Sequence, residues 1–169
     1  MITARELRQL LSYDKETGEF SWLTSPTAPV AKGSKAGYAG FKGYIYIQVC
    51  GRIYKAHRLA WLYVTGKWPS RIVDHKDRNP ANNSWGNLRQ ATGSQNRQNA
   101  GISKSNRSGF KGVYWSKSRN KWAAQIKANG ISKHLIYSSD KTEAAEAYDA
   151  AARKFHGAFA VTNKSLGLL

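Results

Sequence analysis

The chain has 169 residues, with 27 Lys and Arg against 10 Asp and Glu, which gives a formal net charge of +17 at pH 7. A charge this large argues against an ordinary metabolic enzyme and favours a polyanion such as nucleic acid as the partner. The length and the 41% hydrophobic content allow one or two small folded domains and exclude a disordered basic tail.

No apolar run approaches the length of a membrane span, and no signal-peptide core follows the first residues. We therefore expect a cytoplasmic protein without a membrane partner. Cys50 is the only cysteine, which excludes an internal disulfide and a zinc site built from paired cysteines, so no structural zinc is expected.

The first 70 residues predict a short helix, a strand, a β-hairpin and a second helix. Thr3 and Glu6 have the spacing of a capping box at the start of the first helix. A turn at Gly18 leads into a strand around Phe20. The β-rich runs 44–49 and 52–55 predict a hairpin, and the apolar spacing in 57–64 predicts a helix that ends at Gly66.

The stretch from Asp74 to Asn96 combines a carboxylate, an imidazole and several amides. It predicts a strand over 72–74, a turn-rich loop over 77–85, a return strand over 87–89 and a short helix that begins at Thr92 and stops before Gly101. Such a unit can gather Asp74, His75 and Asn96 around one point beside a helix N-terminus. That is a site for a hard metal and a phosphodiester.

The acids are distributed in a way that supports this site. Between Ala31 and Ser139 there are twenty Lys and Arg residues but only two acids, Asp74 and Asp77. A carboxylate facing a polyanion is costly unless a cation lies between them, so Asp74 is a candidate metal ligand. Histidine suits the role of general base because an ordinary imidazole titrates near neutral pH.

A structural interpretation competes with the catalytic one, because Asp and Asn residues also cap turns. We take Asp77, Asn79, Asn82 and Asn83 as turn-makers of this kind. For Asp74 and His75, neighbours on a regular strand point to opposite faces, so both cannot face one phosphate from such a strand. The strand is therefore expected to end or twist at His75, with an irregular backbone there.

The residues Asp74-His75, Asn87 and Asn96, preceded by 57–61, resemble the HNH endonucleases, specifically the phage homing type whose last motif residue is Asn. The resemblance implies that His75 is the general base and that Asp74 and Asn96 hold one divalent metal. Asn87 would brace the loop, and His57 and Arg58 would support the site or contact a phosphate. An Asn ligand suits Mg²⁺ or Mn²⁺ rather than Zn²⁺.

The polar, glycine-containing segment 101–108 is interpreted as a linker. Three β-rich runs follow, at 110–115, 121–127 and 133–137, with turns near Asn120 and at Asn129-Gly130. The run from Thr142 to Phe155 predicts a helix with a Thr cap, and its alanines suit close packing on a sheet. The last 60 residues therefore predict a three-stranded antiparallel sheet packed on one helix.

This segment resembles the Apetala/ethylene-response-factor DNA-binding domain of plant transcription factors, which phage homing endonucleases also carry. The resemblance rests on Gly112-Val113, 122–126, 143–151 and 157–163. In that family the sheet enters the major groove of DNA. The candidate contacts by position are Lys111, Tyr114, Lys117, Arg119, Lys121, Gln125, Lys127 and Lys133; lysine binds a phosphate well but lacks the arginine fork for guanine.

Together these features predict an α+β protein with a ββα-metal (His-Me finger) HNH region followed by the sheet and helix. The domains would be 1–100, with the ββα core at about 71–100, then the linker 101–108 and a DNA-binding domain at 109–163. We expect a homing-type, metal-dependent endonuclease that cuts double-stranded DNA and leaves 3′-OH and 5′-phosphate ends. It would work in the cytoplasm, which is that of a bacterial host if a phage encodes the chain. It would act as a monomer or, for a second cut, as a dimer.

Two other functions remain open at this stage. One is a non-catalytic, sequence-specific DNA-binding regulator that carries a degenerate nuclease motif. The other is a basic RNA-binding protein, which is disfavoured because the sequence carries no RNA-recognition signature.

Overall fold

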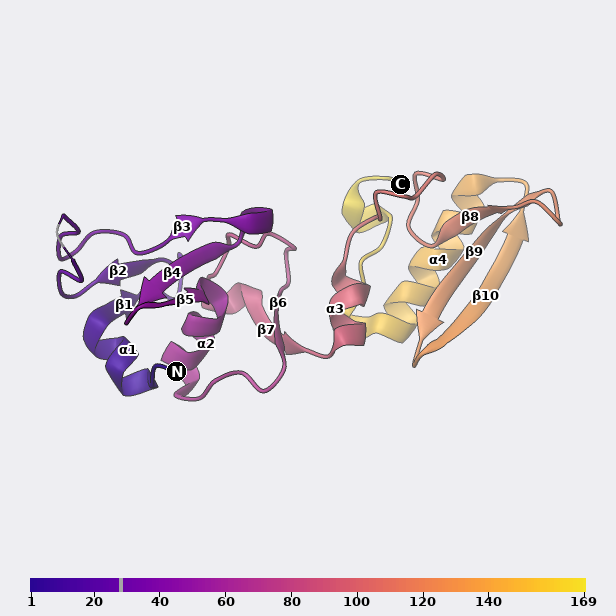
Figure 1. Cartoon of the computed structure of the whole chain (residues 1–169). Coiled ribbons are helices and arrows are strands. Elements are labelled where there is room, and N and C mark those ends of the chain that lie inside the picture. Colours follow the sequence, from indigo (N-terminus) through magenta and orange to yellow (C-terminus); the bar gives the residue numbers. More distant parts are fainter. Residues whose placement is uncertain (28) are drawn as a thin grey trace. The chain divides into compact units, whose positions relative to one another are not determined.

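The structure is a computed structural model that describes residues 1–27 and 29–169. The chain forms two compact units, Met1–Thr92 and Gly93–Leu169 (Figure 1). All paired strands among the described residues are antiparallel, and α-helices occur in both units, so the predicted α+β class is confirmed. Among the described residues no helix is long and apolar enough to cross a membrane.

In the part of the first unit that the structure describes, two α-helices and two short 3-10 helices alternate with short strands. In chain order they are α1 (Ala4–Leu10), β1 (Leu11–Tyr13), β2 (Phe20–Trp22), β3 (Tyr38–Ala39), η1 (Phe41–Gly43), β4 (Ile45–Val49), β5 (Arg52–Lys55), α2 (Ala56–Thr65), β6 (Ile72–His75), η2 (Trp85–Asn87) and β7 (Leu88–Ala91). The strands form a β1-β2 hairpin, a β3-β4-β5 sheet and a β6-β7 hairpin.

Local sequence signals explain the helix ends of this unit. The Thr3 hydroxyl accepts from the Glu6 N–H and the Glu6 carboxylate accepts from the Thr3 N–H, which is the predicted capping box. Helix α2 ends at Gly66, which adopts φ +75° in the left-handed region that glycine enters without strain. Both predicted helices of the first 70 residues are confirmed.

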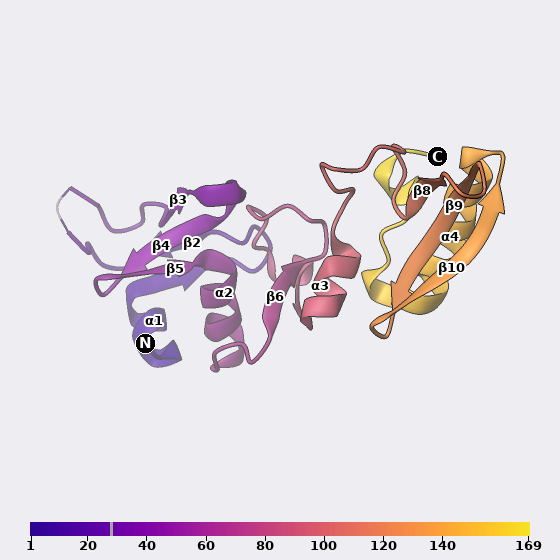
Figure 2. The same ribbon diagram turned by 45° about the vertical axis from the view of Figure 1, so that its right-hand side comes forward.

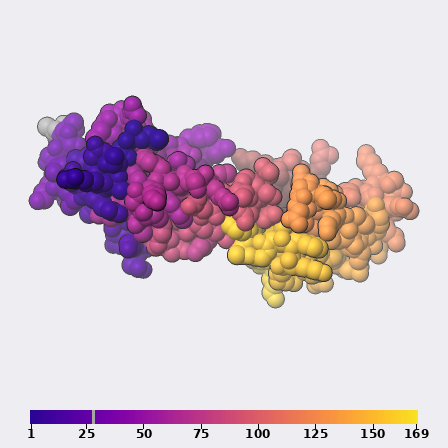
Figure 3. All heavy atoms as spheres, turned by 90° about the horizontal axis from the view of Figure 1, so that it is seen from below, coloured from indigo at the N-terminus to yellow at the C-terminus, as the bar shows by residue number. Residues whose placement is uncertain are grey.

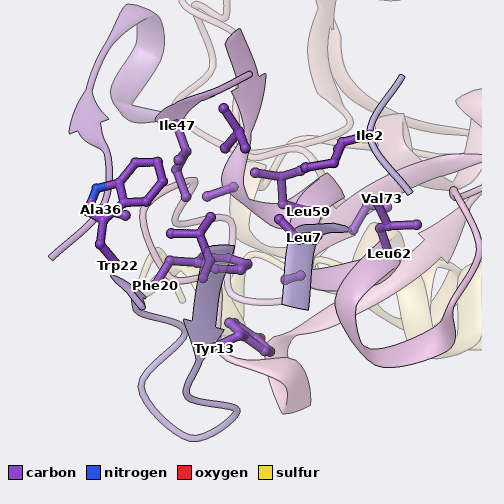
Figure 4. Close-up of a cluster of buried hydrophobic side chains, with 14 of the residues drawn as sticks. Ile2, Leu7, Tyr13, Phe20, Trp22, Ala36, Ile47, Leu59, Leu62 and Val73 are labelled. Atoms are coloured by element: carbon purple, nitrogen blue, oxygen red, sulfur yellow. The ribbon is translucent and has the colours of Figure 1, made fainter. Parts of the chain in front are cut away.

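One hydrophobic core holds the first unit together (Figure 4). Leu7 of α1, Phe20 of β2, Ile47 of β4 and Leu59 of α2 are almost completely buried in it. Val73 of β6 joins the same cluster, so the strand that carries Asp74 and His75 is anchored to the core one residue before them. Burying side chains of this size stabilises each by about 1.5–3 kcal/mol.

The second unit contains α3 (Gly93–Asn99), β8 (Val113–Ser116), β9 (Lys121–Ala128), β10 (Ile131–Ser138), α4 (Lys141–His156), η3 (Gly157–Phe159) and η4 (Lys164–Leu166). The sheet order is β10-β9-β8. Figures 1 and 2 both show α4 lying along one face of this sheet, where its alanines allow the close packing that the sequence predicted. The predicted Thr cap is wrong, because Asp140 is the N-cap and accepts from the Thr142 N–H at 2.8 Å.

The segment after α4 is fixed to the second unit by a buried carboxylate. Asp149 accepts hydrogen bonds from the backbone and side-chain N–H groups of Asn163 at 2.6 and 2.9 Å, and from Lys164 N–H at 2.9 Å. Asn163, fully buried, bonds in turn to both backbone groups of Lys111 before β8. The C-terminal segment therefore lies on the surface of its own unit, where Figure 3 shows it in yellow.

Candidate active site and basic sheet face

The β6-β7 hairpin carries the predicted Asp-His pair. Its register pairs Asp74 with Arg89 and His75 with Leu88. Strand β6 ends at His75, as predicted, and a turn begins at Lys76. Arg78, with φ +67°, continues the turn in the left-handed region. The long loop 76–87 therefore starts directly at the histidine.

Asp74 and His75 lie on opposite faces of β6, and both are buried, with 6% and 5% exposure. Asp74 forms an ion pair with its cross-strand neighbour, with 2.9 Å between its Oδ2 and Arg89 Nε. Burying a carboxylate without a cation is costly, and the Arg89 guanidinium offsets that cost. Asp74 is therefore held in a buried position by its cross-strand cation.

The His75 ring is enclosed by three side chains of the first unit. Its Nε2 lies 3.1 Å from Asn83 Oδ1. The ring centroids of His57 and Tyr44 lie 5.0 and 6.0 Å from that of His75, and the two pack against each other at 5.4 Å. This packing fixes the position of the His75 ring before any substrate arrives.

His57 lies in the first turn of α2 and supports the site as a neutral ring. Burial, with the nearby His75, Lys55 and Arg58, lowers the pKa of His57 to about 3. It is therefore uncharged at neutral pH and adds no positive charge next to His75. The neighbouring Arg58 places its guanidinium over the Trp68 ring, 5.7 Å from the centroid.

Asn87 closes the loop that follows His75. Its Nδ2 donates to Asp77 Oδ1 at 2.9 Å and to the Asn82 carbonyl at 2.8 Å, while its Oδ1 accepts from the Asp77 N–H at 3.0 Å. Burial alone would raise the pKa of Asp77, but hydrogen bonds from Asn79, Asn82 and Asn87 outweigh it and hold the pKa below its usual value. Asn87 thus ties the two ends of the loop together.

The turn of the β1-β2 hairpin supports this loop, which the sequence did not predict. Tyr13 Oη donates to the Asn83 carbonyl at 2.7 Å, and the Trp85 N–H donates to the Lys15 carbonyl at 2.8 Å. Gly18, at φ +76°, approaches so closely that a Cβ there would lie 2.2 Å from the Asn83 carbonyl carbon. The interpretation of Asn83 as only a turn-maker is wrong, since its buried amide contacts His75. The sequence predicted a turn at Gly18 but gave no sign that this turn contacts Asn83.

Asn96 lies in α3, within the second unit, where it is exposed. Among residues 1–27 and 29–169, no group of three or more His, Cys, Asp or Glu side chains could hold a metal ion. Asp74 and Asn96 offer a carboxylate and an amide, which are oxygen donors. Mg²⁺ commonly binds through one or two protein carboxylates and completes its shell with water and phosphate oxygens, so each of these oxygen donors by itself suits a hard cation.

The second unit presents a basic and aromatic sheet face on the side away from α4. The cross-strand row Tyr114, Ala123 and Tyr137 lies on this face, as does the pair of Gln125 with His134. Arg119 reaches it from the β8-β9 turn, 5.7 Å from the Tyr137 ring centroid. The sequence has no acid between 108 and 139. We call this surface the outer sheet face, and its members are Tyr114, Arg119, Lys121, Gln125, Lys127, His134 and Tyr137.

Three of the predicted contacts lie elsewhere in the second unit. Lys133 pairs in register with the core residue Ile126, and its Nζ lies 4.8 Å from the Phe155 ring centroid, so it faces α4. Lys111 donates from its Nζ to the carbonyl of Gln98 at 2.7 Å. Lys117 is exposed in the β8-β9 turn. His134 belongs to the outer sheet face although the sequence did not single it out.

Comparison with known proteins agrees with the hairpin and its loop. Residues 54–98 match the family model described as HNH endonuclease. Protein 3.8 of Escherichia phage T7 is 37% identical over 113 residues, covering 64% of this chain and 93% of that protein. The uncharacterized HNH endonuclease L560 of Acanthamoeba polyphaga mimivirus is 38% identical over 110 residues, covering 64% of this chain and 56% of that protein.

A solved structure that describes DNA binding and cleavage by the HNH homing endonuclease I-HmuI is also similar. The alignment covers 87% of this chain and 85% of the I-HmuI chain, with 23% sequence identity and a TM-score of 0.43. The ββα order of β6, β7 and α3, the Asp-His pair and the family match define an HNH-type nuclease. The chain belongs to the HNH endonuclease family. It is accordingly an enzyme, a nuclease of DNA.

Proposed function

We propose that the chain is a metal-dependent endonuclease of the homing type, in which His75 is the general base. The observation that carries the proposal is the enclosed His75 ring, held at Nε2 by Asn83 at the point where β6 ends. A general base must be positioned before the reaction, and a buried, hydrogen-bonded imidazole at the start of a loop meets that need. Asn87 acts indirectly, by closing the loop.

The proton transfer needs only His75 and water. The imidazole takes a proton from a water molecule, and the hydroxide oxygen attacks the phosphorus of the phosphodiester. The P–O3′ bond breaks and the O3′ oxygen takes a proton from solvent water, so the products carry a 3′-OH and a 5′-phosphate. Asp74 and Asn96 are the proposed ligands of one Mg²⁺ or Mn²⁺, which would neutralise charge on the phosphate and the leaving oxygen.

We propose that the second unit binds double-stranded DNA through the outer sheet face, as in an Apetala/ethylene-response-factor domain. The support is its composition: cations, aromatic rings and an amide without any acid. Lysine and arginine supply phosphate contacts, and the guanidinium of Arg119 suits a guanine edge. With one nuclease motif per chain, the proposed enzyme acts as a monomer that nicks one strand, in the cytoplasm of the infected host.

Cleavage of supercoiled plasmid tests the catalytic proposal. We expect conversion to the nicked form with Mg²⁺ or Mn²⁺ and no conversion after chelation of divalent ions. Asp74→Asn should retain DNA binding but require a much higher metal concentration, because a neutral amide holds a divalent ion more weakly than a carboxylate. DNA binding without nicking by the wild type at any metal concentration would instead favour the DNA-binding regulator.

A pair of lysine variants tests the outer sheet face. Lys127→Ala removes a cation from that face and should weaken duplex binding severalfold and reduce the slope of log affinity against log salt by about one. Lys133→Ala is the matched control, because Lys133 lies on the α4 face of the same sheet and should leave both quantities nearly unchanged. Fluorescence anisotropy with a labelled duplex measures them. Equal effects of the two substitutions would refute the assignment of the face.

A further inference from the structure

We propose that Asn83 is a positioning residue that fixes the tautomer and the orientation of His75, so that Nδ1 is the atom that accepts the proton from water. The inference rests on the proposed role of His75 as general base. The sequence around Asn83 indicates only a turn and does not indicate a role in orienting His75. The inference also identifies Nδ1 of His75 as the atom that takes the proton.

The orientation of the Asn83 amide is set by its second hydrogen bond. Its Nδ2 donates to the Ala81 carbonyl at 3.1 Å, and a carbonyl oxygen can only accept. The amide oxygen therefore faces His75, and it too can only accept. Hence His75 Nε2 must carry the hydrogen of the 3.1 Å bond, and the lone pair of the neutral ring lies on Nδ1.

Asn83 is held rigidly enough to impose this choice. It is 2% exposed, and its backbone carbonyl accepts from Tyr13 Oη at 2.7 Å. Gly18 packs against its backbone from the β1-β2 turn. On the other sides of the ring, His57 and Tyr44 oppose rotation of the imidazole. A flip of the ring about the Cβ–Cγ bond would put Cε1 where Nε2 now lies and would break the bond to Asn83 inside a buried site.

The same bond suits both protonation states of the reaction. When Nδ1 takes a proton, one water O–H bond breaks, one N–H bond forms, and the hydroxide proceeds to phosphorus. The ring then carries hydrogen on both nitrogens, and Nε2 continues to donate to Asn83, now with a positive charge that strengthens the bond. The bond between Nε2 and Asn83 does not have to be rearranged during the transfer, which is the advantage of a preorganised base.

Nitrogen-15 NMR of the histidine-labelled full chain tests the tautomer directly and without any cleavage. Comparison with His75→Gln assigns the His75 signals. At a pH where the ring is neutral, we expect the shift pattern of a protonated Nε2 and an unprotonated Nδ1. A neutral ring with its hydrogen on Nδ1 would overturn the inference, whether or not the protein proves to cut DNA.

Substitutions at Asn83 test the consequence for the rate. Asn83→Leu has a similar size but no acceptor, and we expect single-turnover nicking to slow by about 10- to 100-fold with unchanged DNA affinity. Asn83→Asp keeps an acceptor for Nε2 and should retain the wild-type tautomer and most of the rate. Asn79→Ala, which alters a turn hydrogen bond of the same loop, is the control and should stay near the wild type.

The variants separate a positioning role from a structural one. If the Leu and Asp variants lose the same rate, or if the Leu variant keeps the rate, Asn83 does not act through its acceptor and the inference fails. If the wild type does not nick DNA at all, the proposed catalytic function fails, while the NMR result still decides the tautomer.

Discussion

His75→Ala is expected to slow single-turnover nicking by about 10²- to 10⁴-fold, the range of a lost general base. The affinity for duplex DNA should stay within about twofold of the wild type, because the buried ring is 5% exposed and offers little surface to a phosphate. Quenched-flow nicking of supercoiled plasmid at saturating protein measures the rate, and anisotropy measures the affinity.

Chemical rescue gives this prediction a positive control. Alanine leaves a space bounded by His57, Tyr44 and Asn83, and free imidazole can enter it and replace the missing ring. We expect added imidazole to restore part of the rate of His75→Ala but to leave the wild type unchanged. Nicking by the alanine variant at the wild-type rate would show that another group removes the proton.

Local sequence signals predicted the elements of the fold well. The capping box at Thr3, the glycine end of α2 and the end of β6 at His75 each depend on residues close together in sequence. The prediction of a Thr cap for α4 was wrong. Asp140 and Thr142 both carry a side-chain oxygen, and only the path of the backbone decides which of them accepts from a free N–H at the start of the helix. Short-range sequence patterns therefore predict whether a segment is a helix or a strand, but they do not predict every residue that caps a helix.

Side-chain direction was predicted less well, for two physical reasons. First, Asn83 meets Tyr13 across 70 residues of sequence, and no local pattern encodes that contact. Second, the register of β10 shifts between His134 and Ile136, so simple alternation does not tell which face Lys133 occupies. The residue types alone were enough to predict the Asp74-His75 pair as a candidate site. The contacts that hold the His75 ring depend on tertiary packing and were not predicted.

Gly18→Ala is expected to destabilise the first unit by about 3 kcal/mol or more. The new Cβ would lie 2.2 Å from both the Asn83 carbonyl carbon and the Ser84 nitrogen, which are backbone atoms that cannot move aside as a side chain would. Overpacking of this kind costs about 1–3 kcal/mol, and the φ of +76° adds about 1–2 kcal/mol for a residue with a Cβ. The melting temperature measures the loss.

Gly66→Ala is the control that separates the effect of the close contact at Gly18 from the effect of the positive φ. Gly66 has nearly the same φ, +75°, but a Cβ there would meet nothing within 4 Å. Gly66→Ala should therefore cost only about 1–2 kcal/mol for the backbone conformation and leave nicking intact. Gly18→Ala should also slow nicking at temperatures where the chain stays folded, because the displaced Asn83 no longer holds the His75 ring. Equal melting temperatures and rates for the two variants would mean that the β1-β2 turn does not support the catalytic loop.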